Sequence, residues 1–580
     1  MLYSEIAGVF DRLERTSSRL EMTSIFSEFF KTLDPCSLRK IVYLSQGKLH
    51  PDFCGAELGM ADRLVLRSVA FISGMPESKI DELWKKEGDP GTIAEALFKN
   101  RKQASLFSEP LTLDKVLKNL TLIENAEGKD SQDKKMKYLS NLLMDSGPTE
   151  ARYLCRIVTG RMRIGAGSMT MLDALAEAFG KKEDRPEIER AFNITCDLGL
   201  VAETLAAGGI ESIRMMSVAV GNPIKVMLAE RLPSMSLILD RMGGRCAMEF
   251  KYDGIRIQAH IGRDSVKLYS RRLEDLTSNF PDIAAELRKR CKAGEAIVEG
   301  ECVAVDPEGG MLPFQNVTHR RKKHGMDKAV EDYPVRMFMF DILLADGEDM
   351  TLRPFEDRRS KLSETFDLSE KVQFTTLEVV GSPEEGEDFF NRALGKKCEG
   401  IMAKSLSSEY RAGSRGFFWI KYKKDYEEAL TDSFDLAVVG AFYGRGKRAG
   451  KYGALLMAVF DEESGRYCTV CKLGTGFDDA FLAELPEMLD GYLSETRPRT
   501  VDAEMVPDVW FLPTVVLEVV AAEISLSPIH TAAKGIVKED AGLGLRFPRF
   551  TGRVRDDKGP EECMTMNEVL SMYEMQTRDK

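Results

Sequence analysis

The spacing of apolar residues changes twice along this chain, and those changes constrain its fold more than any other feature. Over residues 1 to about 215, apolar residues recur every three or four positions, as in residues 26–33, which predicts amphipathic helices. From about residue 221 to 427, short β-rich runs alternate with helical stretches. From about 428 to 580, strand-like runs are separated by glycine-rich turns. The sequence therefore predicts a helical, a mixed and a β-rich region in that order.

We expect three domains, with boundaries at residues 1–220, 221–427 and 428–580. A chain of 580 residues is too long for a single hydrophobic core. The predicted fold class is multidomain: an all-α domain, an α+β domain and an all-β domain. Many short strands with one helix indicate a small barrel for the last domain, and the five-stranded oligonucleotide-binding (OB) barrel is the natural candidate.

The predicted elements can be stated by residue range. In the mixed domain, strands are expected over residues 246–250, 256–261, 266–270, 296–305, 335–344 and 400–405, with a helix over 280–289. In the last domain, strands are expected over residues 434–442, 454–460, 468–472 and 515–524, with one helix over 478–489.

Composition indicates a globular chain that does not span a membrane. Hydrophobic residues make up 43% and charged residues 30%, which is typical of globular proteins. No apolar run reaches the ~18–20 residues needed to span a bilayer, and the N-terminus lacks a secretory pattern. We therefore expect a cytoplasmic location and reduced thiols for the eleven irregularly spaced cysteines.

The net charge of −12 argues against nucleic-acid binding, but net charge says little about a local face. Four clusters of Lys and Arg stand out against the acidic background, at residues 152–163, 320–323, 421–424 and 546–558. Each cluster could be a solvated face. Their position beside motif-like segments makes that explanation less satisfactory for all four together.

One lysine stands in the mostly apolar, strand-like run 248–258. Lys251 is followed by Asp253, Gly254 and Arg256. A buried ammonium is costly unless it is paired or used in chemistry. Such a short pattern recurs by chance, so an edge strand with a solvated lysine is the simpler explanation when the run is taken alone.

A glycine-rich turn at residues 160–167 carries Arg161 and Arg163. Ser168 is the expected N-cap of the following helix, and Pro148 or Thr149 is expected to begin the preceding one. Backbone amides at such a turn, with two guanidinium groups, suit a phosphate. The alternative is a turn between helices with surface arginines.

The segment that begins at Lys251 is the first of several motif-like segments that occur in a definite order. They are Lys251 to Gly254, Ser270 to Arg272, Glu299 to Glu301, Phe338 to Leu343, Glu399 to Lys404 and Trp419 to Tyr426, and then Arg546 to Phe550 and Arg555 to Lys558. This set resembles the motifs of the covalent nucleotidyltransferases, and specifically the ATP-dependent DNA ligases of the archaeal and eukaryotic replicative type. The resemblance covers nearly the whole chain.

The resemblance implies an enzyme that seals single-strand nicks in duplex DNA, in replication, repair and recombination, with ATP and Mg²⁺. Lys251 is then the nucleophile that carries AMP. The implied nucleotide contacts are Glu249 for adenine, Arg256 and Arg271 for ribose and the nick phosphate, Glu301 for ribose, Phe340 for stacking on adenine, and Arg415, Lys421 and Lys423 for the α-phosphate. The implied metal-associated carboxylates are Glu301 and Glu399, and Arg555 and Lys558 are implied to orient pyrophosphate.

The resemblance also implies partners. Arg161 and Arg163 fall in the family's DNA-binding domain, so nicked duplex DNA is expected there, and the protein is expected to be a monomer. Gln103, Leu106 and Phe107 lie where archaeal relatives carry a loop that binds a sliding clamp, although a loop tucked into the helical core is the alternative.

The sequence departs from the family pattern in two places. Leu106 replaces a frequent aromatic residue, which puts clamp affinity in doubt. Val226 replaces a usual proline, which predicts a softer linker without an effect on the chemistry.

Other functions fit the sequence less well. An mRNA-capping guanylyltransferase or an RNA ligase shares the lysine motif but does not account for the large helical N-terminal domain. An NAD-dependent ligase would need its own nicotinamide-binding domain and a four-cysteine zinc module. A catalytically inactive DNA-binding scaffold would not need Lys251, Glu301, Glu399 and Lys421 together.

Overall fold

The computed structural model describes residues 1–16, 18–99, 109–232, 234–312, 316–317, 319–321, 326–423, 433–444, 451–494, 496–556 and 558–578. Contacts divide the chain into two compact units, Met1–Val65 with Gln103–Lys424 and Leu66–Lys102 with Asp425–Lys580. Within these described ranges, no helix has the length and apolar character that crossing a bilayer requires.

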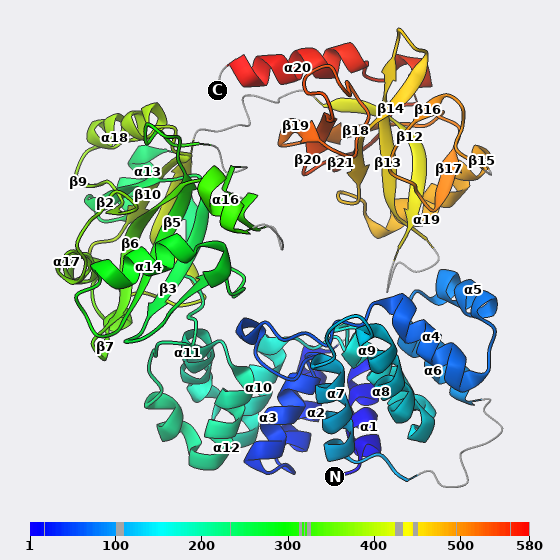
Figure 1. Cartoon of the computed structure of the whole chain (residues 1–580), viewed down its shortest axis with the longest axis horizontal. Helices are drawn as coiled ribbons and strands as arrows, with labels where there is room; N and C mark the ends of the chain where they lie inside the picture. The colour runs from blue at the N-terminus through cyan, green and yellow to red at the C-terminus, as the bar shows by residue number, and fades with distance from the viewer. Residues whose placement is uncertain are drawn as a thin grey trace. The chain divides into compact units, whose positions relative to one another are not determined.

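The N-terminal region is helical, as predicted, and is coloured blue to cyan in Figure 1. Its helices are α1 (Tyr3–Glu14), α2 (Arg19–Phe30), α3 (Pro35–Leu44), α4 (Asp62–Ser73), α5 (Glu77–Glu87), α6 (Pro90–Lys99), α7 (Leu113–Glu124), α8 (Ser131–Asp145), α9 (Pro148–Val158), α10 (Ser168–Phe179), α11 (Arg185–Thr195) and α12 (Leu198–Arg214). In the first unit, α3 packs on α12, α2 on α10 and α1 on α9.

Local sequence determines where these helices begin. Asp34 caps α3 by accepting the N–H of Ser37, and α9 begins at Pro148 as predicted. The predicted cap of α10 was wrong, because Gly167 occupies the N-cap and Ser168 is the first helical residue. Glycine is tolerated at an N-cap without a side-chain hydrogen bond.

The central region contains two sheets flanked by helices. Its strands are β1 (Leu228–Arg231), β2 (Cys246–Lys251), β3 (Ile255–Ile261), β4 (Val266–Ser270), β5 (Ala296–Ala304), β6 (Val335–Ala345), β7 (Glu348–Asp349), β8 (Val372–Phe374), β9 (Leu377–Val380), β10 (Gly400–Lys404) and β11 (Arg415–Lys423). Its helices are α13 (Met235–Arg241), α14 (Pro281–Arg290), α16 (Met326–Asp332), α17 (Phe355–Thr365) and α18 (Pro383–Gly395). The strands predicted from sequence are confirmed to within about a residue at each end.

The two sheets pack face to face. One has the order β1-β11-β10-β2-β9, and the other has the order β4-β3-β5-β6-β7 with β8 beside β6. Met248 and Ile401 from the first sheet share a hydrophobic cluster with Val303 and Phe338 from the second. Strand β2 lies between β10 and β9, so the strand that carries Lys251 is internal and the edge-strand explanation is wrong.

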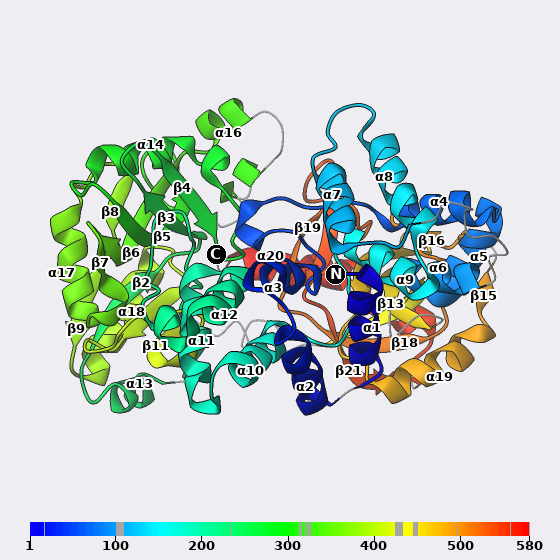
Figure 2. The ribbon, with the colours of Figure 1, turned by 90° about the horizontal axis from the view of Figure 1, so that it is seen from below.

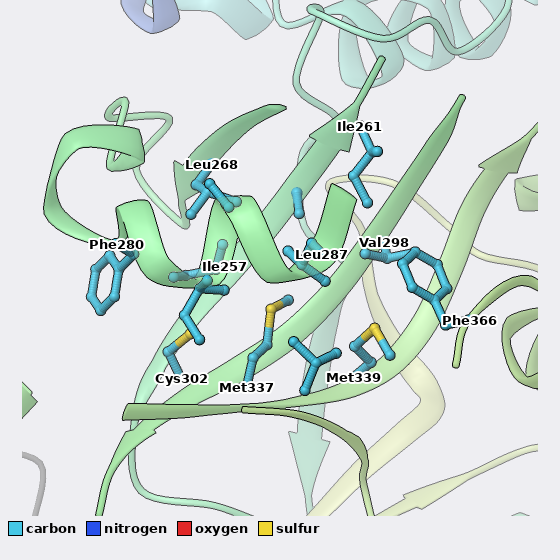
Figure 3. Packing of buried hydrophobic residues seen from close by; sticks show 14 of the residues in the cluster. Ile257, Ile261, Leu268, Phe280, Leu287, Val298, Cys302, Met337, Met339 and Phe366 are labelled. Carbon is cyan, nitrogen blue, oxygen red and sulfur yellow. The ribbon is translucent and has the colours of Figure 1, made fainter. Parts of the chain in front are cut away.

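Helix α14 covers the outer face of the second sheet, and both ribbon views draw it beside β3 (Figures 1 and 2). Figure 3 shows Leu287 of α14 pointing into the space lined by Ile257, Val298 and Met337. These four side chains are fully buried. Their packing fixes β3 and β5, the strands on which several candidate site residues stand.

The C-terminal region is a β-rich half-barrel with two helices. Its elements are β12 (Phe434–Tyr443), β13 (Tyr452–Asp461), β14 (Arg466–Leu473), α19 (Asp479–Asp490), β15 (Leu493–Ser494), β16 (Val501–Asp502), β17 (Val509–Phe511), β18 (Val516–Val520), β19 (Glu523–Ser527), β20 (Gly542–Arg546), β21 (Arg549–Val554) and α20 (Met566–Arg578). The predicted strand 515–524 is in fact β18 followed by β19, which pairs with a different neighbour. Helix α20 was not predicted, and its Val569 packs into the core of this region.

We predict that Leu287→Ala lowers the stability of the central region by about 2–5 kcal/mol, because it removes a fully buried side chain and leaves a cavity. Thermal unfolding followed by calorimetry measures the loss. Leu20→Ala on α2 is the control, since Leu20 is 83% exposed. Equal losses of stability in the two variants would contradict the packing of Leu287 shown in Figure 3.

Candidate active site

The Lys251 side chain stands at the end of β2, beside the carboxylate of Glu399. Its Nζ lies 2.5 Å from Glu399 Oε2, and the ammonium of Lys423 pairs with the same oxygen. Burial alone would raise the pKa of Glu399, but the two ammonium groups lower it to about 2. Glu399 therefore stays ionised and joins two cations that stand 172 residues apart in the chain.

Strand order explains how these three residues meet. Gly400 of β10 lies opposite Lys251 of β2 on one side and opposite Lys423 of β11 on the other. Gly400 has φ +149°, and a Cβ there would lie 2.2 Å from the carbonyl oxygen of Tyr422. Only glycine permits this approach, which places the adjacent Glu399 between the two lysines.

A second carboxylate of the site has the opposite electrostatic character. Glu301 lies on β5, in register with Arg256 of β3. Loss of hydration raises the pKa of Glu301 to about 7, and the charges of Lys251 and Arg256 offset part of this rise. Two neighbouring carboxylates with oppositely shifted pKa values are typical of functional sites.

A third carboxylate, Glu249, is two residues before Lys251 on β2 and therefore faces the same side of the strand. Its Oε2 lies 2.6 Å from Nζ of Lys404, and both side chains are almost completely buried. Burial raises the pKa of Glu249, and the cations of Lys404 and Arg359 oppose that rise. Among the described residues, the buried Oε1 of Glu249 has no hydrogen-bond partner, and the Arg359 guanidinium lies 3.7 Å from it.

Phe340 of β6 is surrounded by cations. The Lys404 ammonium lies 4.7 Å and the Arg256 guanidinium 5.3 Å from its ring centre. Trp419 meets the ring edge-on, with ring centres 6.1 Å apart. The ring is only partly buried, so part of it remains available to a planar ligand.

Three residues of this environment were missed from sequence: Lys404, Glu299 and Tyr410. Lys404 had a usable signal, because it is a lysine in an otherwise apolar strand, the same anomaly that singled out Lys251. Glu299 lies two residues before Glu301 on β5 and so faces the same side of the strand. Its position in the same motif was a weaker signal for a role in the site. Tyr410 had none, because its role arises only from tertiary contacts.

The three remaining candidate phosphate contacts lie on β11 or beside β4. Arg271 is exposed in the turn after β4. Arg415 begins β11, and its side chain is outside the described part of the structure. Lys421 is half-buried on β11, in register with Met402 of β10.

The candidates outside the central region have their own surroundings. Arg161 lies in the turn between α9 and α10 and pairs with Asp62 at 3.1 Å, and Arg163 in the same turn has φ +57°. In the second unit, Arg555 and Lys558 both pair with Asp435 of β12, Lys558 at 2.7 Å. Gln103, Leu106 and Phe107 lie outside the described residues.

The two packed sheets of the central region, with a lysine on an internal strand beside an ionised carboxylate and a second ammonium group, are the fold of a nucleotidyltransferase domain. Comparison with known proteins agrees with this class. The family model "DNA ligase N terminus" matches residues 2–176, "ATP dependent DNA ligase domain" matches residues 226–423, and "ATP dependent DNA ligase C terminal region" matches residues 448–558. The chain belongs to the ATP-dependent DNA ligase family.

Full-length relatives support the same assignment. DNA ligase 2 of Thermofilum pendens is 47% identical, over 99% of this chain and 98% of its own. The DNA ligase of Caldivirga maquilingensis is 43% identical, over 100% of this chain and 98% of its own. A solved structure named Pmar-Lig_Pre. covers 95% of this chain and 99% of its own, with a TM-score of 0.55 at 16% identity, which is a likeness in fold.

We predict that, in the absence of ATP and metal, the stability of the Glu301→Gln variant rises relative to that of the natural protein as pH is raised from 5 to 8. The folded-state pKa of Glu301 is raised to about 7 from an ordinary 4.5, so between these two pH values the folded protein binds a proton that the unfolded chain has lost. The natural protein therefore loses stability as pH rises through 7, whereas the glutamine variant does not titrate.

Glu399→Gln is the matched comparison for this pH series. The pKa of Glu399 is lowered to about 2, so its contribution is complete above about pH 5 and is lost only as pH falls below 4.5. Melting temperatures at each pH measure both differences. A flat difference for Glu301→Gln between pH 5 and 8 would contradict the raised pKa.

Proposed function

We propose that this chain seals single-strand nicks in duplex DNA through an AMP carried on Lys251. The observation that supports this most is the contact of the Lys251 ammonium, 2.5 Å from Glu399, on an internal strand whose same face carries Glu249. A lysine in that position is aligned by its neighbours and close to a base-binding carboxylate. Such alignment is what a nucleophile requires.

The nucleotide is proposed to bind across the two sheets. The adenine amine would donate to Oε1 of Glu249, which has no other hydrogen-bond partner among the described residues, and the base would stack on Phe340. Glu301, Arg256 and Arg271 are proposed to contact ribose and, later in the reaction, the nick phosphate. Lys421, Lys423 and Arg415 are proposed to bind the α-phosphate.

Mg²⁺ is proposed to be held by Glu301 and Glu399. Carboxylates are the ligands that Mg²⁺ prefers, and it commonly takes one or two of them together with substrate phosphates. Glu399 fits this requirement because it is ionised at neutral pH. When bound, the ion would neutralise charge on the phosphate oxygens.

In the first step, neutral Nζ of Lys251 attacks the α-phosphorus of ATP. A P–N bond forms, the P–O bond to the β-phosphate breaks, and pyrophosphate leaves with the electron pair of that bond. The amine must be without its third proton when it attacks, because an ammonium has no lone pair. The 5′-phosphate of the nick then takes AMP from Lys251, and the 3′-hydroxyl displaces AMP to close the strand.

Arg555 and Lys558 are proposed to orient the pyrophosphate leaving group. Both are cations on one turn, closed by the N–H of Lys558 donating to the carbonyl of Arg555 at 3.1 Å. We propose that residues 428–580 form a domain that approaches the nucleotide for this step and withdraws for DNA joining, as a lid does. Residues 1–220 and 221–427 are proposed as the other two domains.

The helical domain is proposed to bind the duplex through Arg161 and Arg163. The protein is proposed to act as a monomer. A sliding clamp is proposed as a partner through Gln103, Leu106 and Phe107, and loss of clamp-stimulated sealing on alanine substitution of Phe107 would test that contact.

We expect α-labelled ATP with Mg²⁺ to label the natural protein in a form that survives denaturation, and Lys251→Ala to abolish the label. Removal of metal with EDTA should abolish labelling as well. Lys267→Ala is the matched control, because Lys267 also extends from a strand and pairs with an aspartate, Asp275 at 3.2 Å. Equal label in Lys251→Ala would overturn the proposed nucleophile, and nick sealing with NAD in place of ATP would overturn the proposed nucleotide.

We also expect affinity for nicked DNA to fall steeply with salt, because bound phosphates release counterions. The double variant Arg161→Ala with Arg163→Ala should make the fall of log affinity with log salt less steep, by about one unit of slope for each lost phosphate contact. Arg12→Ala is the control, an exposed arginine of α1 that pairs with Glu28. An unchanged slope in the double variant would remove these arginines from the interface.

A further inference from the structure

Residues 221–227, which we call the strap, connect the helical region to β1 and run alongside β3. Their backbone is held by side chains rather than by pairing with a strand. The N–H of Gly221 donates to His260, the N–H of Ile224 donates to Gln258, and the N–H of Met227 donates to the hydroxyl of Tyr410. Three fixed points over seven residues leave the strap little freedom.

The Gln258 amide is fully used in this arrangement. Its Oε1 accepts from the N–H of Ile224 at 2.7 Å, and its Nε2 donates to the Ile224 carbonyl at 3.0 Å. Nε2 also lies 3.3 Å from Oε1 of Glu299, and Oε1 lies 2.9 Å from Nε2 of His260. Every donor and acceptor of the amide therefore has a partner, which fixes its orientation.

The same bonds determine the state of His260. Its Nδ1 accepts the N–H of Gly221 at 3.1 Å, so Nε2 carries the proton and donates to Gln258. Burial lowers the pKa of His260 to about 3. The ring is therefore neutral at working pH, and this end of the strap does not respond to pH between 5 and 8.

The other end of the strap contacts Arg256 directly. The Arg256 guanidinium donates to the Met227 carbonyl at 3.0 Å and to Oε2 of Glu299 at 2.7 Å. The Tyr410 hydroxyl donates to the same Glu299 oxygen at 2.9 Å and accepts from Met227 at 2.9 Å. Glu299 is completely buried, so its charge is neutralised inside this network.

The strap is also fixed from the side of the helical region. The N–H of Lys225 donates to the carbonyl of Asn193, at the end of α11, at 2.8 Å. The Lys225 ammonium lies 3.6 Å from the ring centre of Phe192. Ile194, Ile224 and Met227 belong to one hydrophobic cluster, so the strap is held between α11 and β3.

We infer that Tyr410 and Glu299 are positioning residues for Arg256, and that the strap is the fixed support against which they hold it. A free arginine side chain has many rotamers, and holding it ready for a ligand removes that freedom before binding. Three acceptors achieve this for Arg256: the Met227 carbonyl of the strap, Oε2 of Glu299 on β5, and the Tyr410 hydroxyl in the loop before β11, 3.4 Å from the guanidinium. The inference rests on the proposed function, in which Arg256 contacts ribose and the nick phosphate.

Tyr410→Phe tests the inference, because it removes one hydroxyl and leaves the ring. We expect about a 10- to 100-fold loss in the rate of sealing pre-adenylated nicks and in kcat/KM for ATP, by analogy with residues that orient metal ligands. The matched control is Tyr153→Phe in α9. Its side chain is also buried, and its hydroxyl donates to Glu14 at 2.7 Å and accepts from Arg152 at 3.1 Å, but it belongs to a helix of the N-terminal region.

A double-mutant cycle with Arg256→Ala separates positioning from a general structural role. If Tyr410 acts through Arg256, Tyr410→Phe should change the rates less than about twofold in the Arg256→Ala background. Glu299→Gln, measured in the same cycle, serves if Tyr410→Phe does not fold. Equal losses in both backgrounds, or unchanged kinetics in a folded Tyr410→Phe protein, would overturn the inference.

Failure of the two proposals can be distinguished. A natural protein that takes no label from ATP overturns the proposed function and this inference with it. A natural protein that is labelled and seals nicks, with additive Tyr410 and Arg256 variants, overturns only the inference. Titration of ATP into each variant gives a second measurement, since misplaced Arg256 should weaken binding in Tyr410→Phe and not in Tyr153→Phe.

Discussion

The pairing of β10 with β2 on one side and with β11 on the other is the constraint on which this site depends. It brings Lys251, Glu399 and Lys423 together, although Lys251 lies almost 150 residues before Glu399 in the chain. The carboxylate of Glu399, just before β10, then carries a single negative charge between two positive ones. Without Gly400 the backbone of β10 could not approach β11 closely enough to place it there.

The carboxylates of the central region differ in their charge state because their surroundings differ. Glu399 has two ammonium partners and a lowered pKa, whereas Glu301 has a raised pKa because lost hydration outweighs its neighbouring cations. A group that titrates near neutrality responds to the arrival of a metal or a phosphate, while one that is always ionised provides a constant charge. Glu249 differs from both, because its buried partner Lys404 stabilises its charge, and its other oxygen is buried 3.7 Å from the Arg359 guanidinium without a hydrogen-bond partner among the described residues.

The sequence predicted most strands, the order of the regions and the segments that carry the site, because periodicity and motif order are local properties. It did not predict the ionic partners, because those depend on strand register and on which face a side chain occupies. Lys404 is an example, since it can pair with Glu249 only because β10 pairs with β2 in the sheet. The split of residues 515–524 into β18 and β19 was missed because strand pairing, not local propensity, decides it. Helix α20 was missed although its Val569 packs into the core of the same region.

The strap gives the departure at Val226 a physical meaning. A proline would restrict the linker by fixing φ at one residue, and valine leaves that freedom in the unfolded chain. In the folded protein, the N–H groups of Ile224, Lys225 and Met227 are all bound by partners on β3, α11 and the loop before β11. Hydrogen bonds from several elements therefore supply the rigidity that a single proline would supply locally. This rigidity depends on the fold being complete, so Arg256 is held in place only when the helical region and both sheets have assembled around the strap.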